Sequence, residues 1–172
     1  MSRLRPALVI LASSLLLTAC GSGNGKSADE SIVVTTSETP EAQATTTDPV
    51  KADSLRGSTT DPGLNVDWTY QGVSSGQSGG SVLTVLVTNQ NDEPLPPSAI
   101  PQPTLKYNSG GGSMVDADPV PNDDTDLPLG LDLPLGAGAS TNLRYVFDVS
   151  PGNLWDAKLQ VGSVVWEGNL NF

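Results

Sequence analysis

Apolar and polar residues alternate along much of the chain after residue 62, and this period of two is typical of half-buried β-strands. The alternation is clearest over residues 64–70 and 143–149, where apolar residues recur at every second position. The run 81–88 is rich in β-branched residues at consecutive positions, which predicts a central strand buried on both faces. Shorter alternations predict further strands at 105–107, 113–115, 159–161 and 164–170.

Glycine and proline separate these predicted strands. Five prolines between residues 94 and 103 form a rigid connection that a central strand cannot contain. About seven short strands joined by such turns, without a convincing helix, predict an all-β fold, an Ig-like antiparallel β-sandwich. A chain of this size buries about two thirds of its unfolded surface, so we expect it to fold without cross-links.

The N-terminal part has a different composition. Every aromatic residue lies at or after Trp68, and residues 21–61 are dense in Thr, Ser, Gly and acids. Such a segment cannot bury enough apolar area to offset its chain entropy. We therefore predict a disordered tether over 20–61, which as a coil spans roughly 35 Å, and a folded domain over 62–172.

Residues 1–19 have the features of a secretory signal. Arg3 and Arg5 precede an apolar run over 7–17, which is shorter than the about 20 residues that a membrane-spanning helix needs. The sequence Leu17-Thr18-Ala19-Cys20 then resembles the lipobox of bacterial lipoproteins. The resemblance implies cleavage before Cys20 and a diacylglycerol on its thiol. We expect a lipid anchor on the extracytoplasmic face of the cell membrane, unless Cys20 is discarded with the signal.

The net charge and the absence of histidine argue against several classes of function. Removal of Arg3 and Arg5 with the signal leaves six basic against nineteen acidic residues, a net charge of −13. Such a body repels nucleic acid, so we expect no nucleic-acid partner. The chain has no histidine, and Cys20 is its only cysteine. Since the commonest general base and the commonest transition-metal ligands are missing, we expect no cofactor and no enzymatic activity.

Two blocks of the predicted domain resemble a family of bacterial extracellular Ig-like domains. The first is Val85-Leu86-Val87-Thr88-Asn89 followed by Asp92-Glu93-Pro94, and the second is the Gly136-Ala-Gly138 turn with the segment from Tyr145 to Pro151. The family includes the secreted immunoprotective antigen of mycobacteria, and the resemblance covers roughly 62–172. The family's usual Pro-Gly-Glu turn is Gly-Ala-Gly here. The resemblance implies an Ig-like domain at the surface of a Gram-positive cell, with no established catalytic residues.

An acidic loop is one candidate site. Asp123, Asp124 and Asp126 lie close together between prolines, and calcium takes clustered carboxylate oxygens of this kind. A solvated acidic loop that binds nothing explains the same pattern. Asp123 with Asp132 would form the acid/base pair of a glycosidase only at a fixed separation, which the sequence does not define.

Trp155 is the other candidate. It follows the Pro151-Gly152 turn, whereas Trp68 and Trp166 belong to alternating strands and are predicted core residues. Trp155 either caps the end of the core or lies exposed, where it would stack on a sugar or anchor a protein partner. We therefore expect a non-enzymatic domain that binds a protein or an envelope component, or serves as an accessory subunit of a membrane complex. The alternative is a carbohydrate- or calcium-linked envelope enzyme.

Overall fold

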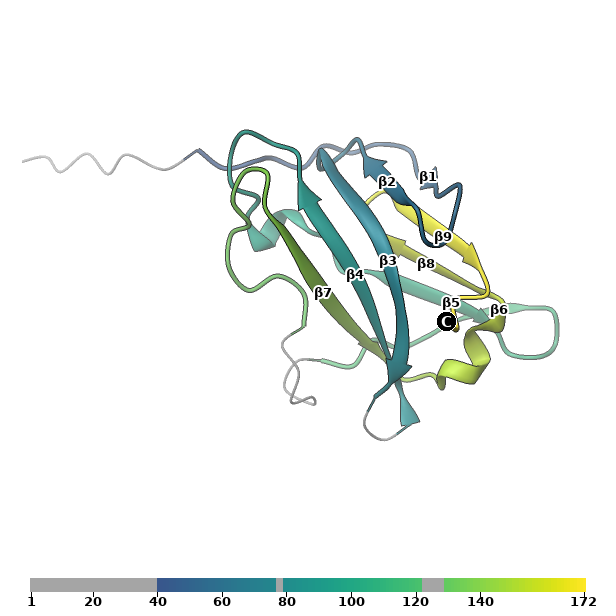
Figure 1. Cartoon of the computed structure of the whole chain (residues 1–172). Helices are drawn as coiled ribbons and strands as arrows, with labels where there is room; N and C mark the ends of the chain where they lie inside the picture. Colours follow the sequence, from purple (N-terminus) through teal and green to yellow (C-terminus); the bar gives the residue numbers. More distant parts are fainter. Residues whose placement is uncertain (1–39, 77–78, 122–128) are drawn as a thin grey trace, which may run out of the picture. The chain divides into compact units, whose positions relative to one another are not determined.

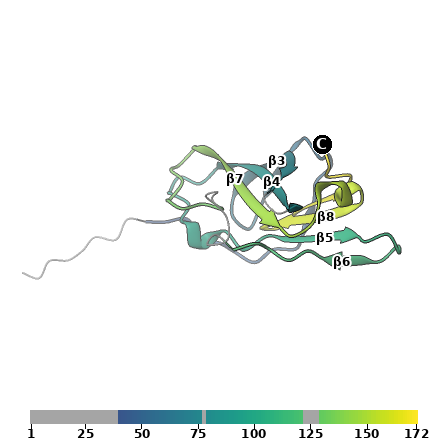
Figure 2. The same cartoon turned by 90° about the horizontal axis from the view of Figure 1, so that it is seen from below.

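The computed structural model describes residues 40–76, 79–121 and 129–172. Apart from short 3-10 turns, their regular structure is all strand, and the strands form two facing sheets (Figures 1 and 2). This confirms the predicted all-β sandwich. The strands are β1 (Val50–Lys51), β2 (Ser58–Asp61), β3 (Val66–Ser75), β4 (Ser81–Asn89), β5 (Thr104–Asn108), β6 (Met114–Asp116), β7 (Ser140–Phe147), β8 (Ala157–Val161) and β9 (Val164–Gly168). The turns are η2 (Pro97–Ala99) and η4 (Pro151–Trp155).

The order of the strands follows the Ig plan. One sheet has the order β2-β3-β4-β7 and the other the order β1-β9-β8-β5-β6. The antiparallel β4–β7 and β5–β8 pairs correspond to the B–E and C–F pairs of Ig domains, with β9 and β6 flanking the second pair. β1 runs parallel to β9 at the edge. Seven of these nine strands are those predicted from the sequence, and β1 and β2 are additional.

The expected domain boundary at residue 62 is wrong, because the sandwich begins earlier. Ala42 is buried in the core, and its amide donates to the Pro94 carbonyl at 2.9 Å. β1 pairs with β9, β2 pairs with β3, and Asp61 is fully buried. Edge strands gain backbone hydrogen bonds without a large apolar content, so the polar composition of this segment gave no sign of them. Residues 38–172 form one compact unit that contains both sheets.

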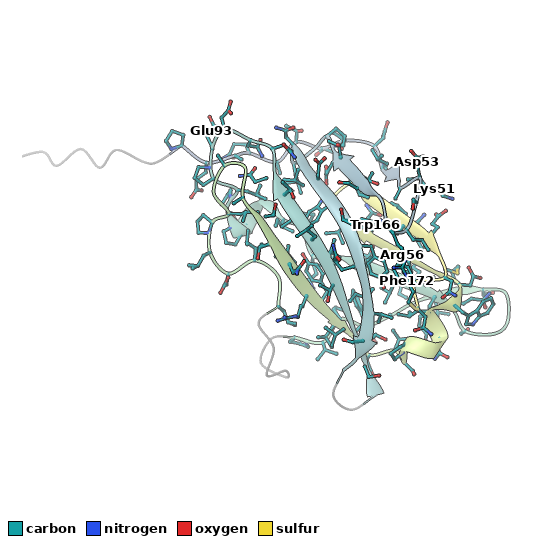
Figure 3. All side chains as sticks on the ribbon, in the orientation of Figure 1. Lys51, Asp53, Arg56, Glu93, Trp166 and Phe172 are labelled. Carbon is teal, nitrogen blue, oxygen red and sulfur yellow. The ribbon has the colours of Figure 1, made fainter. Side chains whose placement is uncertain are left out.

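Aromatic side chains fill the space between the sheets. Trp68 and Trp166 are fully buried, as predicted. Tyr70 lies 6.3 Å from Trp166 and meets Phe172 edge-on at 5.3 Å, both distances measured between ring centroids. The Arg56 guanidinium covers Phe172 from outside, 4.1 Å from the ring centroid (Figure 3). The C-terminal segment is therefore part of the core packing.

The described parts of the connection between β6 and β7 pair with the outer edge of β7. Val120 donates its amide to the Val146 carbonyl, Asp148 donates to Asp118, and Gly130 donates to Arg144. The outer edge of β7 is thus paired, although no long strand adjoins it. The edge of β6 has no neighbouring strand among the described residues. No helix in the described ranges is long and apolar enough to cross a membrane.

Candidate functional site

Trp155 is exposed because of the short turn that carries it. Pro151 occupies the first position of η4, where its fixed φ favours the turn and its missing amide hydrogen costs nothing. Leu154 is fully buried and anchors η4 to the core. The side chain of the next residue, Trp155, leaves the core and is 53% exposed. Of the two alternatives considered for Trp155, the structure therefore shows the exposed one.

Two hydrogen bonds tie the end of η4 to β5. The Asn108 amide donates to the Asp156 carbonyl, and the Asn108 Nδ2 donates to the Asp156 Oδ2, both at 2.9 Å. Met114 of β6 pairs with Asn108, and Val115 pairs with Tyr107. The β5–β6 hairpin and η4 consequently lie at the same end of the molecule, as both views show (Figures 1 and 2).

This end carries three exposed apolar side chains, Met114, Val115 and Trp155, which we call the η4 patch; Met114 and Val115 are consecutive in β6, so they lie on opposite faces of the sheet. Their exposed fractions are 42%, 36% and 53%. They are three of the four exposed large hydrophobic residues in the described part of the chain, and the fourth is Leu133. The border is polar: Asp156 follows Trp155, and Asp116 pairs with Lys106 at 2.7 Å. An aromatic residue in an apolar surface with a polar rim is typical of protein interfaces.

A groove of about 440 Å³ lies beside β7, where the crossover passes over its edge. We call it the β7 groove. Its walls include Pro97, Ile100, Pro121, Leu131, Tyr145 and Phe147. Tyr145 is only 6% exposed, and burial raises the pKa of its phenol well above the ordinary value. Its hydroxyl has no hydrogen-bond partner among the residues that the structure describes.

Asp61 is the most completely hydrogen-bonded carboxylate in the described structure, but it is not a binding site. It is fully buried and accepts bonds from the amides of Gly63, Leu64 and Ser163, from the Ser163 hydroxyl and from the Trp68 indole, at 2.6 to 3.2 Å. These donors come from both sheets. Because neutral groups occupy both of its oxygens, this carboxylate joins the sheets and has no capacity left for a ligand.

Asn89 joins the end of β4 to the turn before β7. Its Nδ2 donates to the Leu135 carbonyl at 2.9 Å and to the Gly136 carbonyl at 3.2 Å. Its Oδ1 accepts a bond from the Asn91 amide at 3.0 Å. The end of β4 and the turn before β7 are therefore fastened to each other by a buried side chain, which is a structural role.

Of the remaining predicted site residues, the structure describes only Asp132. Cys20, Asp123, Asp124 and Asp126 lie outside the described residues. Asp132 is exposed. Across the three described ranges, no three His, Cys, Asp or Glu side chains lie together in a way that would hold a metal ion.

No protein-family model fits this chain, and neither a curated protein nor a solved structure is similar to it. The resemblances to the lipobox and to the extracellular Ig-like family therefore stay predictions from the sequence.

Proposed function

We propose that this chain is a lipid-anchored module on the extracytoplasmic face of the cell membrane, and that its Ig-like domain binds a protein partner through the η4 patch. Cys20 carries the lipid, and the chain between it and the sandwich holds the domain away from the bilayer. The domain acts by binding and not by catalysis. The observation that carries the proposal is that Met114, Val115 and Trp155 are exposed and belong to elements that meet at one end of the domain.

A protein suits this patch better than a sugar. A sugar needs several hydrogen-bonding groups around one stacking ring, whereas Met114 and Val115 are two further exposed apolar side chains at the same end of the domain as Trp155. Met and Trp are both enriched in protein interfaces. The neighbouring strand β6 is an edge strand, so its backbone adds hydrogen-bonding capacity beside the patch. Asp156 and the acidic character of the whole chain favour a partner with a basic rim.

Position-specific photocrosslinking in intact cells tests this function. A photoreactive phenylalanine at position 155 or 114 is expected to give one discrete adduct. The same probe at position 133 is the matched control. Leu133 is 70% exposed and precedes the start of β7, whereas Trp155 follows the end of β7. Identical adducts from all three positions, or none from 155 and 114, would contradict a protein contact at the patch.

The anchor has its own test. Cys20→Ser removes the thiol that would accept the lipid, so the protein is expected to move from the membrane fraction to unprocessed or released material. Intact-mass analysis of the native protein should show acyl chains on Cys20 at the new N-terminus. Normal membrane retention of Cys20→Ser would overturn the anchor, while the proposal for the patch would stand on the crosslinking result.

A further inference from the structure

We propose that the partner of the η4 patch binds as an extended segment that adds an antiparallel strand to the free edge of β6, with a basic side chain opposite Asp116. This inference rests on the proposed function and specifies how the protein partner is held. β6 is the last strand of the five-stranded sheet, and Figure 2 shows it at the outer edge beside β5. Main-chain hydrogen bonds at such an edge supply affinity, and alternate side chains supply specificity.

The direction of the backbone groups of β6 follows from its ladder with β5. The Ala117 amide donates to the Leu105 carbonyl at 2.9 Å, one position beyond Asp116 in this ladder. Bonded and non-bonded pairs alternate between antiparallel strands, so Val115 directs its amide and carbonyl toward β5, whereas Met114 and Asp116 direct theirs away from it. Among the described residues, the outward groups of Met114 and Asp116 have no backbone partner.

The same side of the chain is already paired farther along. The Asp118 carbonyl accepts a bond from the Asp148 amide, and the Val120 amide donates to the Val146 carbonyl, both at 2.9 Å. The described chain before residue 122 therefore runs along β7, away from the free edge. On the other side of this pairing, Pro151 starts η4 and ends the line of β7. A partner strand beside β6 would continue the line that the chain itself leaves there.

The other strand edges of the described structure lack these features. β2 has the polar sequence Ser-Thr-Thr-Asp, and β1 has two residues, of which one is Lys51. Lysine and other polar side chains at an edge oppose the addition of a foreign strand. The outer edge of β7 already bonds Val120 and Gly130. β6, in contrast, combines free backbone groups with two exposed apolar side chains, those of Met114 and Val115.

A row of charges across the five-stranded sheet determines the charge of the incoming side chain. Glu167 of β9 contacts Lys158 of β8 at 3.0 Å, and Lys158 lies opposite Lys106 of β5. Lys106 in turn contacts Asp116 of β6 at 2.7 Å, and there the row ends with a carboxylate whose side chain is 72% exposed. Opposite charges on neighbouring strands stabilise a sheet and like charges destabilise it. A lysine or arginine opposite Asp116 therefore suits this edge, and it also suits the net charge of −11.

The pleat assigns the next two side chains of the partner. Met114 shares one face of the sheet with Asp116, and Val115 lies on the other face. From its N-terminus, an antiparallel partner segment therefore has a basic residue opposite Asp116, an apolar residue opposite Val115 and an apolar residue opposite Met114. The two apolar residues would remove the exposed surface of β6 from water.

A second copy of this chain suits the edge less well. A two-fold pairing of β6 with itself, centred on Val115, would place each Asp116 opposite a methionine. Neither carboxylate would gain a cation, and two bodies with a net charge of −11 would be brought together. The charges therefore favour a different protein with a basic segment.

Two synthetic peptides test this mode of binding on residues 38–172, the compact unit that contains both sheets. Acetyl-Thr-Lys-Val-Val-Thr amide has the expected pattern, and the matched peptide has Glu in place of Lys. At millimolar peptide, NMR should show shifts of the Met114 and Asp116 amides. The lysine peptide should bind about three- to tenfold more tightly, because an exposed charge pair changes from attraction to repulsion. Equal binding, or no shift at this edge, would overturn the proposal.

Methylation of the peptide backbone tests whether a strand is added. In the antiparallel arrangement, the amide of the second valine donates to the Met114 carbonyl, whereas the amide of the first valine points away from β6. Methylation of the second valine amide should weaken binding at least about fivefold, and methylation of the first should change it less than about twofold. Equal effects of the two methyl groups would contradict main-chain pairing.

A charge reversal locates the basic contact. Asp116→Lys should reverse the preference between the two peptides. Asp132→Lys makes the same change of net charge at an exposed position before β7 and should leave the preference as it is. An unchanged preference in Asp116→Lys would mean that the charge of the peptide is not recognised at Asp116.

The remaining outcomes separate this inference from the proposed function. Shifts of the Met114 amide that depend on protein concentration without peptide would identify a second copy as the occupant and overturn the choice of partner. Failure of the peptides, with photocrosslinked adducts from positions 155 and 114 still formed in cells, would overturn the added strand alone. Loss of those adducts would overturn the proposed function and this inference together.

Discussion

Two regions of the sandwich differ in which kind of side chain they bury: one buries a carboxylate, and the other exposes an indole. At the corner of Asp61, a charged side chain is fully buried and receives five hydrogen bonds from neutral donors. At the η4 end, an indole stays half in water although a buried leucine precedes it directly. In the first region, all five hydrogen bonds of the carboxylate connect parts of the fold to one another. The second leaves apolar surface that the fold does not use, and this surface is what a partner would cover.

The largest expected loss of stability comes from removing the Asp61 carboxylate. Asp61→Ala removes the acceptor for five buried or half-buried donors that come from both sheets, so the free energy of unfolding should fall by about 3–5 kcal/mol. Urea unfolding followed by tryptophan fluorescence measures the change. Asp132→Ala is the control at an exposed aspartate and should stay within about 0.5 kcal/mol of wild type. A loss below about 1 kcal/mol for Asp61→Ala would contradict the role assigned to this carboxylate.

The next prediction compares the contributions of Leu154 and Trp155, neighbours in η4, to the free energy of unfolding. Leu154→Ala should lower the free energy of unfolding by about 2–5 kcal/mol, since the side chain is fully buried. Trp155→Ser should lower it by less than Leu154→Ala does, by about 1–2 kcal/mol, because only about half of the indole surface is removed from water. Denaturant unfolding of the two variants side by side makes the comparison. A large loss of stability in Trp155→Ser would mean that the indole caps the core.

Gly162, which lies against the Asp61 carboxylate, tests how tightly this buried region is packed. Gly162 has φ +57°, and a Cβ at this position would clash with the Asp61 carboxylate. Gly162→Ala should therefore destabilise the fold by about 2–3 kcal/mol, of which the left-handed conformation alone accounts for about 1 kcal/mol. Gly138→Ala is the matched control, with φ +68° and open space around it. Equal thermal shifts for the two variants would show that crowding by Asp61 adds nothing.

The smallest effect concerns an exposed ion pair on the five-stranded sheet. Glu167 accepts bonds from Lys51 at 2.5 Å and Lys158 at 3.0 Å, and these bonds hold the pKa of its carboxyl below the ordinary value of 4.5. A lowered pKa stabilises the fold above the unfolded pKa, and this contribution is lost as the pH falls below about 4.5. Glu167→Gln should cost less than about 1 kcal/mol at pH 7, and less in high salt. A loss unaffected by salt would contradict an exposed electrostatic pair.

The sequence predicted the strands better than the sites. Alternation and one run of β-branched residues located β3 to β9, although β6 is exposed along its whole length. It missed β2, whose residues Ser58 to Asp61 are polar and join the sheet through backbone bonds and a buried carboxylate. Trp155 was identifiable from its place after a turn. Met114 and Val115 were not, because a short apolar strand gives no sign of whether another strand will cover its edge.

The most direct test of the account is hydroxyl-radical footprinting of the η4 patch in intact cells and in the purified domain. Trp155 and Met114 should oxidise readily in the purified domain, as their exposure requires, and should be protected in cells, where the partner covers them. Leu133 should oxidise to the same extent in both samples and so corrects for access to the cell surface. Equal oxidation of Trp155 and Met114 in cells and in isolation would contradict the claim that this end binds a partner.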